Sequence, residues 1–442
     1  MFIYPAPLKR TAEALRTGQL DLSTFLDDLC DRIDRTEPFI QALVPERDRR
    51  ARLQQEAQAL QASSPDPSRR PPLYSVPVGV KDIVRVDGFP THAGSRLPPH
   101  LFDGPEAAVV AALRRAGALI LGKTVTTEFA YFQPGPTRNP HQPDHTPGGS
   151  SSGSAAAVAA GYCPLALGTQ TIGSVIRPAA FCGIVGFKPT RDRISPTGLI
   201  PFSPSADQVG LFTQDVGGMT LVAAILCRGW ESILASQYST LPMLGVPEGP
   251  YLQQASPATL AIFEEQLAGL AAAGCVIRRV TALEEIDGIA RHHHDMIAAE
   301  AAEIHAEWFQ TYEPLYGPHM AAIIRAGREV SPQALAAARD GRESLRLELA
   351  RVMNAAGIDL WVTPAAPGPA PRGLTTTGSP AMNLPWTYAG MPALSLPAGC
   401  TKNGLPLGLQ LVAGFEADEQ LLAWAESLAL VFPHRADSVP SK

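Results

Sequence analysis

The sequence predicts an α/β protein: a single large domain whose mixed, mostly parallel central sheet is covered by helices. Short apolar, β-branched segments alternate with helix-forming segments along the chain, a pattern typical of strands joined by helical crossovers. Hydrophobic residues make up 45% of the 442 residues and charged residues 18%, which supports a large core. Because no repeat, low-complexity tail or shift in composition marks a boundary, we expect one domain over residues 1–442.

The N-terminal half predicts helices first and then the start of the sheet. Residues 8–62 carry apolar side chains at helical spacing and predict two or three helices, with Asp21 a plausible start. A Pro/Ser/Arg loop at 63–72 leads into a core that we place at 73–229. Its predicted elements are a strand at 73–84 ending near Lys81, a helix at 107–116 stopped by Gly117, a strand at 118–121, a helix at 154–161, a strand at 165–167 and a helix after Asp215.

The C-terminal half predicts the rest of the sheet and a helical insertion. Residues 283–352 carry almost only helical signal, broken near Pro314, Pro318 and Pro332, and we expect them to shape the substrate pocket. The remaining predicted elements are strands at 244–247, 276–280, 358–363, 392–397 and 406–412, helices at 257–273 and 417–431, and a Pro/Gly-rich loop at 364–380.

Composition excludes several classes of function. The net charge of −6 is scattered, with no basic stripe, so we expect no direct contact with nucleic acid. No apolar run reaches 18 residues and no basic-then-apolar signal opens the chain, so we expect a cytoplasmic protein without a membrane segment. The six cysteines are far apart and form no CxxC pair, which favours reduced, buried thiols.

Two segments match known motifs letter for letter, but the structure predicted around each segment does not fit the motif. Gly117–Thr124 fits the phosphate-loop pattern GxxxxGK[ST], yet a predicted helix precedes it and its four middle residues are apolar, as in a buried strand. Gly149–Gly153 fits the GxSxG elbow of serine hydrolases, yet the polar, Pro-rich residues before it cannot form an interior strand. Neighbouring positions of a helix point in different directions, so His292–His294 make a poor metal site, and we expect them on a solvated helix face.

The stretch Thr146–Thr190 holds two clusters of glycine and serine and is the best candidate for a site. A serine nucleophile without a histidine base needs another proton acceptor. Lysine can serve only if burial keeps it neutral. Lys81 ends an apolar strand, which meets that condition, although a strand-end surface lysine is the alternative. Asp82 would hold a charge on Lys81 unless it points to the opposite face, as adjacent strand residues do.

Three segments together resemble the amidase signature family, whose members carry a Lys–Ser–Ser triad. They are Gly79-Val80-Lys81-Asp82, Gly148-Gly149-Ser150-Ser151 and Ile172-Gly173-Ser174-Val175-Ile176-Arg177-Pro178-Ala179. The resemblance is dense from about residue 73 to 229 and weaker at 383–414. It implies an amidohydrolase in which Ser174 is the nucleophile, Ser150 bridges after a non-proline cis peptide, and Lys81 is the base.

The resemblance also assigns the residues around the triad. The backbone amides of Thr171, Ile172, Gly173 and Ser174 would surround the oxyanion, with Gly149 and Ser151 supporting the bridging serine. Two departures stand out: Gln170 where the family often has Asp, and Ile172 where a glycine is usual. Because a β-branched residue disfavours positive φ, we expect Ile172 in an ordinary backbone region. We expect neither a cofactor nor a metal.

The substrate stays open at this stage. The segment around Arg177 is most like that of malonamidase, where the matching arginine binds a substrate carboxylate; a structural arginine that satisfies loop carbonyls is the alternative. Similar segments occur in hydrolases of carboxylated ureas such as carboxybiuret and in the subunit that releases ammonia from glutamine for tRNA-bound glutamate, which needs a partner. A catalytically silent binding protein is a further alternative. The resemblance also implies a homodimer as one candidate oligomeric state, because homodimers are common in the family.

Overall fold

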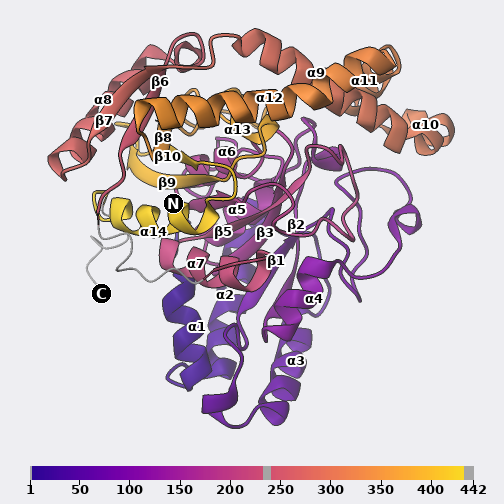
Figure 1. The fold of residues 1–442 in the computed structure, drawn as a ribbon. Helices are drawn as coiled ribbons and strands as arrows, with labels where there is room; N and C mark the ends of the chain where they lie inside the picture. The colour runs from indigo at the N-terminus through magenta and orange to yellow at the C-terminus, as the bar shows by residue number, and fades with distance from the viewer. Residues whose placement is uncertain (1, 232–239, 433–442) are drawn as a thin grey trace.

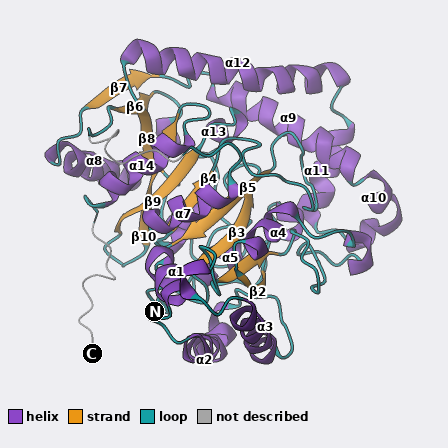
Figure 2. Ribbon diagram, turned by 60° about the horizontal axis from the view of Figure 1, so that its bottom comes forward, coloured by secondary structure: helices purple, strands orange, loops and turns teal. Residues whose placement is uncertain are grey.

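The computed structural model describes residues 2–231 and 240–432 and has a ten-stranded sheet at its centre (Figures 1 and 2). The strand order is β2-β1-β3-β5-β4-β9-β10-β8-β6-β7. The strands are β1 (Pro77–Lys81), β2 (Leu119–Thr124), β3 (Leu165–Gln170), β4 (Val185–Lys188), β5 (Gln208–Thr213), β6 (Leu244–Glu248), β7 (Ile277–Thr281), β8 (Leu360–Pro364), β9 (Ala393–Cys400) and β10 (Pro406–Ala413).

Helices surround the sheet, with α1–α3 at one end of the molecule and α9–α12 at the opposite end (Figure 1). They are α1 (Leu8–Thr17), α2 (Leu22–Ile40), α3 (Arg49–Ser63), α4 (Ala108–Arg115), α5 (Ser152–Ala159), α6 (Ile176–Cys182), α7 (Val216–Leu226), α8 (Pro257–Ala272), α9 (Ile286–Ile304), α10 (Ala306–Tyr312), α11 (Pro318–Arg328), α12 (Pro332–Ala356), α13 (Leu384–Tyr388) and α14 (Asp418–Ala429). Within the described residues, no helix is both long and apolar enough to cross a membrane.

The predicted helix starts have a visible cause. Asp21 caps α2 by accepting a hydrogen bond from the Thr24 amide, and Asp215 caps α7 in the same way through Gly218. Such caps satisfy amide groups that the first turn of a helix leaves without partners. The predicted single α/β domain is confirmed, and most of the helices and strands that were predicted have bounds within a few residues of those in the structure.

The prediction that the sheet is mostly parallel is wrong. Four strand pairs are parallel, on its two flanks: β1 with β2 and β3, and β6 with β7 and β8. The five pairs across the middle are antiparallel. In two of these five pairs, β4 with β5 and β9 with β10, the strands follow each other with no helix between them, and strands joined without a crossover can pair antiparallel. Neither β4 nor β5 was among the predicted strands.

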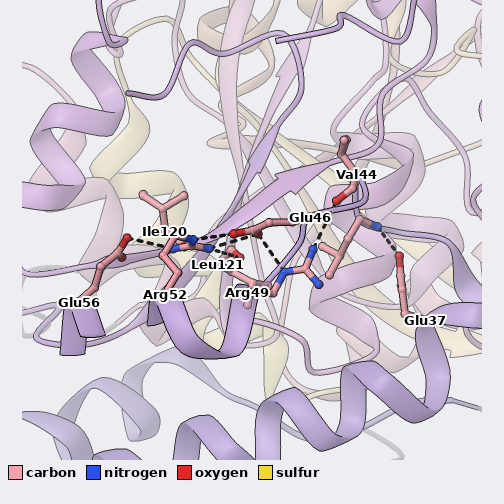
Figure 3. Close-up of polar contacts among 9 residues, drawn as sticks. Glu37, Val44, Glu46, Arg49, Arg52, Glu56, Ile120 and Leu121 are labelled. Carbon is pink, nitrogen blue, oxygen red and sulfur yellow. Dashed lines mark hydrogen bonds and ion pairs between the residues drawn. The ribbon is translucent and has the colours of Figure 1, made fainter. Parts of the chain in front are cut away.

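The outer edge of β2 is contacted by an arginine side chain from α3 (Figure 3). Arg52 on α3 donates from Nη1 to the carbonyl oxygen of Ile120 at 2.9 Å and from Nη2 to that of Leu121 at 3.1 Å. Glu46 holds the guanidinium in place, with its Oε1 2.6 Å from Arg52 Nε. An edge strand exposes unpaired backbone groups that invite pairing with other chains. The arginine satisfies two of these groups, and the Val44 amide, which donates to the Lys123 carbonyl at 2.9 Å, satisfies a third.

Two short, fully buried helices lie beside the sheet, and a serine cluster lies at the start of each. α5 has the sequence SGSAAAVA and every residue of it is buried, as is every residue of α6. Small side chains let the α5 backbone approach its neighbours closely: a Cβ added at Gly153 would lie 2.2 Å from the Ala42 carbonyl oxygen. The chain enters α5 just after Ser150 and α6 just after Ser174, so both clusters sit at the entrance of a buried helix.

Candidate active site

Lys81 is the last residue of β1 and is completely buried. Its Nζ lies 2.7 Å from Ser150 Oγ and 2.8 Å from Thr169 Oγ1, within hydrogen-bonding distance of both. Burial lowers the pKa of the Lys81 amine well below its ordinary value, while the Asp207 carboxylate acts in the opposite direction. A neutral amine in this position can donate to Thr169 and still accept a proton from Ser150. Lys81 therefore has the environment of a base.

Asp82 does not hold a charge on Lys81. Its Oδ1 lies 2.8 Å from Nζ of Lys123, and both side chains of this ion pair are 3% exposed. Lys123 belongs to the segment that matches the phosphate-loop pattern. That segment is mostly strand β2, and its lysine also donates to Thr91 Oγ1 at 3.0 Å. The expectation that Asp82 points away from Lys81 is confirmed. The Asp82 carboxylate pairs instead with Lys123, the lysine of the phosphate-loop pattern.

The peptide between Gly149 and Ser150 is cis, as the resemblance implied. Its surroundings are tightly packed, since a Cβ added at Gly149 would lie 2.7 Å from Thr377 Cγ2. The Gly149 carbonyl accepts from Arg177 Nη2 at 2.6 Å. Ser151 Oγ lies 3.2 Å from both the amide nitrogen and the carbonyl oxygen of Thr169. Ser150 is thus held beside Lys81 by contacts on both sides of it.

Ser174 lies in the loop between β3 and α6, is 7% exposed, and lines a pocket. The walls are mostly apolar, with one cationic side chain. The lining residues are Ala130, Tyr131, Phe132, Thr171, Ile172, Ser174, Arg177, Phe202 and Pro380. The preceding glycine, Gly173, packs closely: a Cβ there would lie 2.4 Å from Asn383 Oδ1. Ser174 is therefore the serine that a substrate in this pocket would meet.

The loop that ends at Ser174 is shaped by Gln170. Its Oε1 accepts from the amides of Val175 at 2.7 Å and Ile176 at 3.0 Å. No acceptor among the described residues takes a hydrogen bond from the amides of Ile172, Gly173 or Ser174, so these three donors are free for a ligand. Ile172 lies outside the left-handed region, as its β-branched side chain requires.

Arg177 is 2% exposed, on α6, behind the nucleophile loop. Its Nη2 donates to the Gly149 carbonyl and, at 3.2 Å, to Thr377 Oγ1. Its Nε and Nη1 are buried and have no protein partner among the described residues. Burial lowers the pKa of Arg177 to about 9. One edge of the guanidinium thus supports the cis-peptide loop, and the other donors remain unsatisfied.

Comparison with known proteins places this geometry in a family. The family model Amidase matches residues 25–422, nearly the whole chain. This chain belongs to the amidase signature family. It is accordingly an enzyme that acts on amide C–N bonds.

Relatives in the family have several specificities. A glutamyl-tRNA(Gln) amidotransferase subunit from Synechococcus sp. (strain RCC307) is 32% identical, covering 98% of this chain and 99% of the relative. A crystal structure of an amidase superposes with a TM-score of 0.86 at 30% identity over 97% of this chain and 100% of the other. 6-Aminohexanoate cyclic dimer hydrolase in complex with its substrate superposes with a TM-score of 0.84 at 25% identity over 98% of each chain. The particular likeness to malonamidase is not among these findings.

Sequence reasoning missed two members of this amidase's site and misplaced a third. Thr169, the second partner of Lys81, sits in an apolar strand and gives no signal of its own. Thr387 on α13 donates to the Ile172 carbonyl at 2.7 Å from far along the chain. His293 was expected on a solvated helix face, which is wrong. It is 1% exposed, and its Nε2 lies 3.0 Å from the Thr171 carbonyl oxygen, because α9 packs that side of the helix inward.

Proposed function

We propose that this enzyme hydrolyses a small carboxamide to a carboxylic acid and ammonia through an acyl-enzyme on Ser174. Ser174 Oγ attacks the amide carbon, and the carbonyl π electrons move to oxygen. The proton of Ser174 passes to Ser150, whose own proton passes to Lys81. Collapse of the tetrahedral intermediate breaks the C–N bond, and the relay returns a proton to the leaving ammonia. Water then repeats the steps to release the acid and free Ser174.

Two features of the site support this mechanism. The first is the burial of Lys81, which lowers the pKa of its amine and so favours the neutral form, the only form that can accept a proton from Ser150. The second is the set of free amides at Ile172, Gly173 and Ser174, which would face the developing oxyanion. One such donor is worth roughly 3 kcal/mol of barrier in serine hydrolases, so two or three of them would supply a large share of the catalysis.

The substrate we favour carries a carboxylate near its scissile amide, such as the monoamide of a dicarboxylic acid. The observation behind this choice is the pair of unsatisfied donors on Arg177 in the wall of the Ser174 pocket. A buried donor without an acceptor costs free energy, and more so on a charged group. A substrate carboxylate would supply the missing acceptors and the counter-charge together, and a guanidinium edge suits carboxylate geometry.

A hydrolysis screen tests this proposal directly. The panel contains neutral primary amides, dicarboxylic monoamides, aryl amides and carboxylated ureas, with ammonia release as the readout. Ser174→Ala should abolish hydrolysis of every substrate while leaving the circular dichroism spectrum unchanged; full activity in that variant would refute the mechanism. In the wild type, kcat/KM should be highest for the carboxylated amides.

Arg177 needs a matched control because it also supports the Gly149 carbonyl. Arg177→Met should lower kcat/KM for a dicarboxylic monoamide by about 100-fold more than for the matching neutral amide, the loss expected for a buried charged hydrogen bond. Thr377→Val removes one structural partner of Arg177 and keeps the guanidinium. It should therefore lower kcat/KM by the same factor for the dicarboxylic monoamide and for the neutral amide. An Arg177→Met variant that still prefers the carboxylated amide would exclude the carboxylate role.

A second candidate is the ammonia-releasing subunit of a tRNA-dependent amidotransferase. It is favoured by the relatives of that name, which align with nearly the whole chain at about 32% identity. Such a subunit would act on glutamine and need a partner. The test is to purify a tagged chain from its own cells and to measure glutamine hydrolysis with and without any protein that copurifies. Hydrolysis that rises with such a partner would support this candidate. A carboxylated-urea hydrolase is the third candidate, because the segment around Arg177 also resembles hydrolases of that class, and the same screen would identify it through its carboxylated ureas.

A further inference from the structure

Two consecutive carbonyls of the nucleophile loop are held by side chains from distant parts of the chain. The Thr171 carbonyl oxygen lies 3.0 Å from Nε2 of His293 on α9. The Ile172 carbonyl accepts from the Thr387 hydroxyl at 2.7 Å, from α13. His293 and Thr387 are almost completely buried, and neither belongs to the 73–229 core that carries Lys81, Ser150 and Ser174. Among the described residues neither is hydrogen-bonded to those three side chains, so the proton relay itself gives them no role.

The planar peptide group connects these anchors to the oxyanion donors. In a trans peptide the C=O of one residue and the N–H of the next point in opposite directions and cannot rotate independently. Fixing the carbonyl of Thr171 therefore fixes the direction of the Ile172 amide. Fixing the carbonyl of Ile172 fixes that of Gly173 in the same way. Neither of these two amides has an acceptor among the described residues.

Both anchors are themselves held in place. The His293 ring packs edge-on against Tyr388 with ring centroids 5.8 Å apart, and the Tyr388 hydroxyl donates to the Ala338 carbonyl on α12. The Thr387 hydroxyl accepts from Gln170 Nε2 at 2.9 Å and has a second, longer acceptor in the Asn383 carbonyl at 3.1 Å. Burial lowers the pKa of His293 to about 4, so at neutral pH the ring is uncharged and its Nε2–H is the donor that the Thr171 carbonyl requires.

We propose that His293 and Thr387 are positioning residues that aim the backbone amides of Ile172 and Gly173 at the oxyanion of the reacting amide. The proposal rests on the function proposed above, with Ser174 as nucleophile. It gives α9 and α13 a defined task in catalysis: each acts through one peptide plane. It also predicts that their hydrogen bonds stabilise the tetrahedral intermediate and leave the ground-state complex unaffected.

Paired variants of the full-length enzyme test this assignment. Thr387→Val keeps the shape of the side chain and removes the hydroxyl, whereas Thr387→Ser keeps the hydroxyl. His293→Phe removes the donor, and His293→Gln keeps an N–H. Losing an oxyanion donor outright costs about 100- to 1,000-fold in kcat. Because the amide here is misdirected and not removed, Thr387→Val and His293→Phe should each lower kcat by about 10- to 100-fold, with KM within about threefold. The Ser and Gln variants should stay within about fivefold of wild type.

A pair of inhibitors separates positioning from a general loss of structure. The aldehyde analogue of the best amide substrate forms a tetrahedral adduct with Ser174 and places an oxyanion in the hole, whereas the product acid does not form such an adduct. Thr387→Val and His293→Phe should each weaken binding of the aldehyde by a factor at least tenfold larger than the factor by which they weaken binding of the acid. An equal loss for both inhibitors, or kcat equal to wild type, would overturn the proposal. Full activity in Ser174→Ala is a different result, since it would overturn the function on which the proposal rests.

Discussion

The buried ion pair between Lys123 and Asp82 offers a sharp test of how the site is built. The two side chains are 3% exposed and their charged atoms are 2.8 Å apart. Burial lowers the pKa of Lys123 and the Asp82 carboxylate raises it; burial raises the pKa of Asp82 and Lys123 lowers it. Each charge is therefore sustained by the other. Lys123→Met keeps the length of the side chain and leaves the carboxylate of Asp82 buried without its partner.

The expected loss of stability follows from that burial. Removing one partner of a buried pair costs about 3–5 kcal/mol, because the remaining charge is left uncompensated. With an unfolding entropy of about 2.1 cal/mol/K per residue, the 442 residues give roughly 0.9 kcal/mol/K. The substitution should then lower the melting temperature by about 3–6 °C.

Calorimetry and urea unfolding measure this loss. The control is the double variant Lys123→Met with Asp82→Asn, in which neither charge remains. It should recover at least half of the lost stability, because a neutral amide costs far less to bury than an unpaired carboxylate. The reasoning is refuted if Lys123→Met melts at the wild-type temperature, or if the double variant is less stable than the single one.

Three further predictions concern the base, the nucleophile loop and a buried histidine. Asp207→Asn removes the charge that raises the pKa of Lys81, so the acidic limb of the kcat/KM profile should move to lower pH; a shift to higher pH would contradict this. Gly173→Ala should lower kcat at least tenfold in steady-state assays, since its Cβ would lie 2.4 Å from Asn383 Oδ1, and unchanged kcat would show that the loop can yield. The pKa of His305 is lowered by burial from 6.5 to about 3, so its contribution to stability is complete above pH 6.5 and is lost as pH falls. In urea titrations His305→Phe should make stability less pH-dependent between pH 6 and 4, by about 1.4 kcal/mol per pH unit, and an unchanged slope would count against it.

The sequence was most informative where chemistry and local structure coincide. Lys81 at the end of an apolar strand, with Asp82 directed to the other face, follows from the two-residue period of a strand alone. The sequence alone also indicated that the phosphate-loop pattern is a chance match, because the four apolar residues between its glycines indicate a strand. Ser150 and Ser174 came from the family resemblance, since glycine and serine clusters by themselves do not say which hydroxyl reacts.

What sequence could not reveal depends on tertiary packing. Which of three consecutive histidines faces inward is set by how α9 docks, and only His293 is buried among them. Thr387 meets Ile172 across 215 positions of sequence, a contact that no local pattern encodes. The strands β4 and β5 were missed because they are short and buried on both faces, without the alternation that marks a half-exposed strand.

The order of strands across the sheet also bears on how the protein is made. β4 ends at Lys188, yet one of its neighbours in the sheet is β9, which begins at Ala393. At about 5–20 residues per second, ribosomes would need on the order of 10–40 s to make the intervening chain. During that interval one edge of β4 lacks its partner, and such edges invite pairing with other chains. Slow or stalled synthesis in this interval should therefore favour aggregation of the nascent enzyme, and the Ser174 loop should lack its Thr387 anchor until residue 387 has been made.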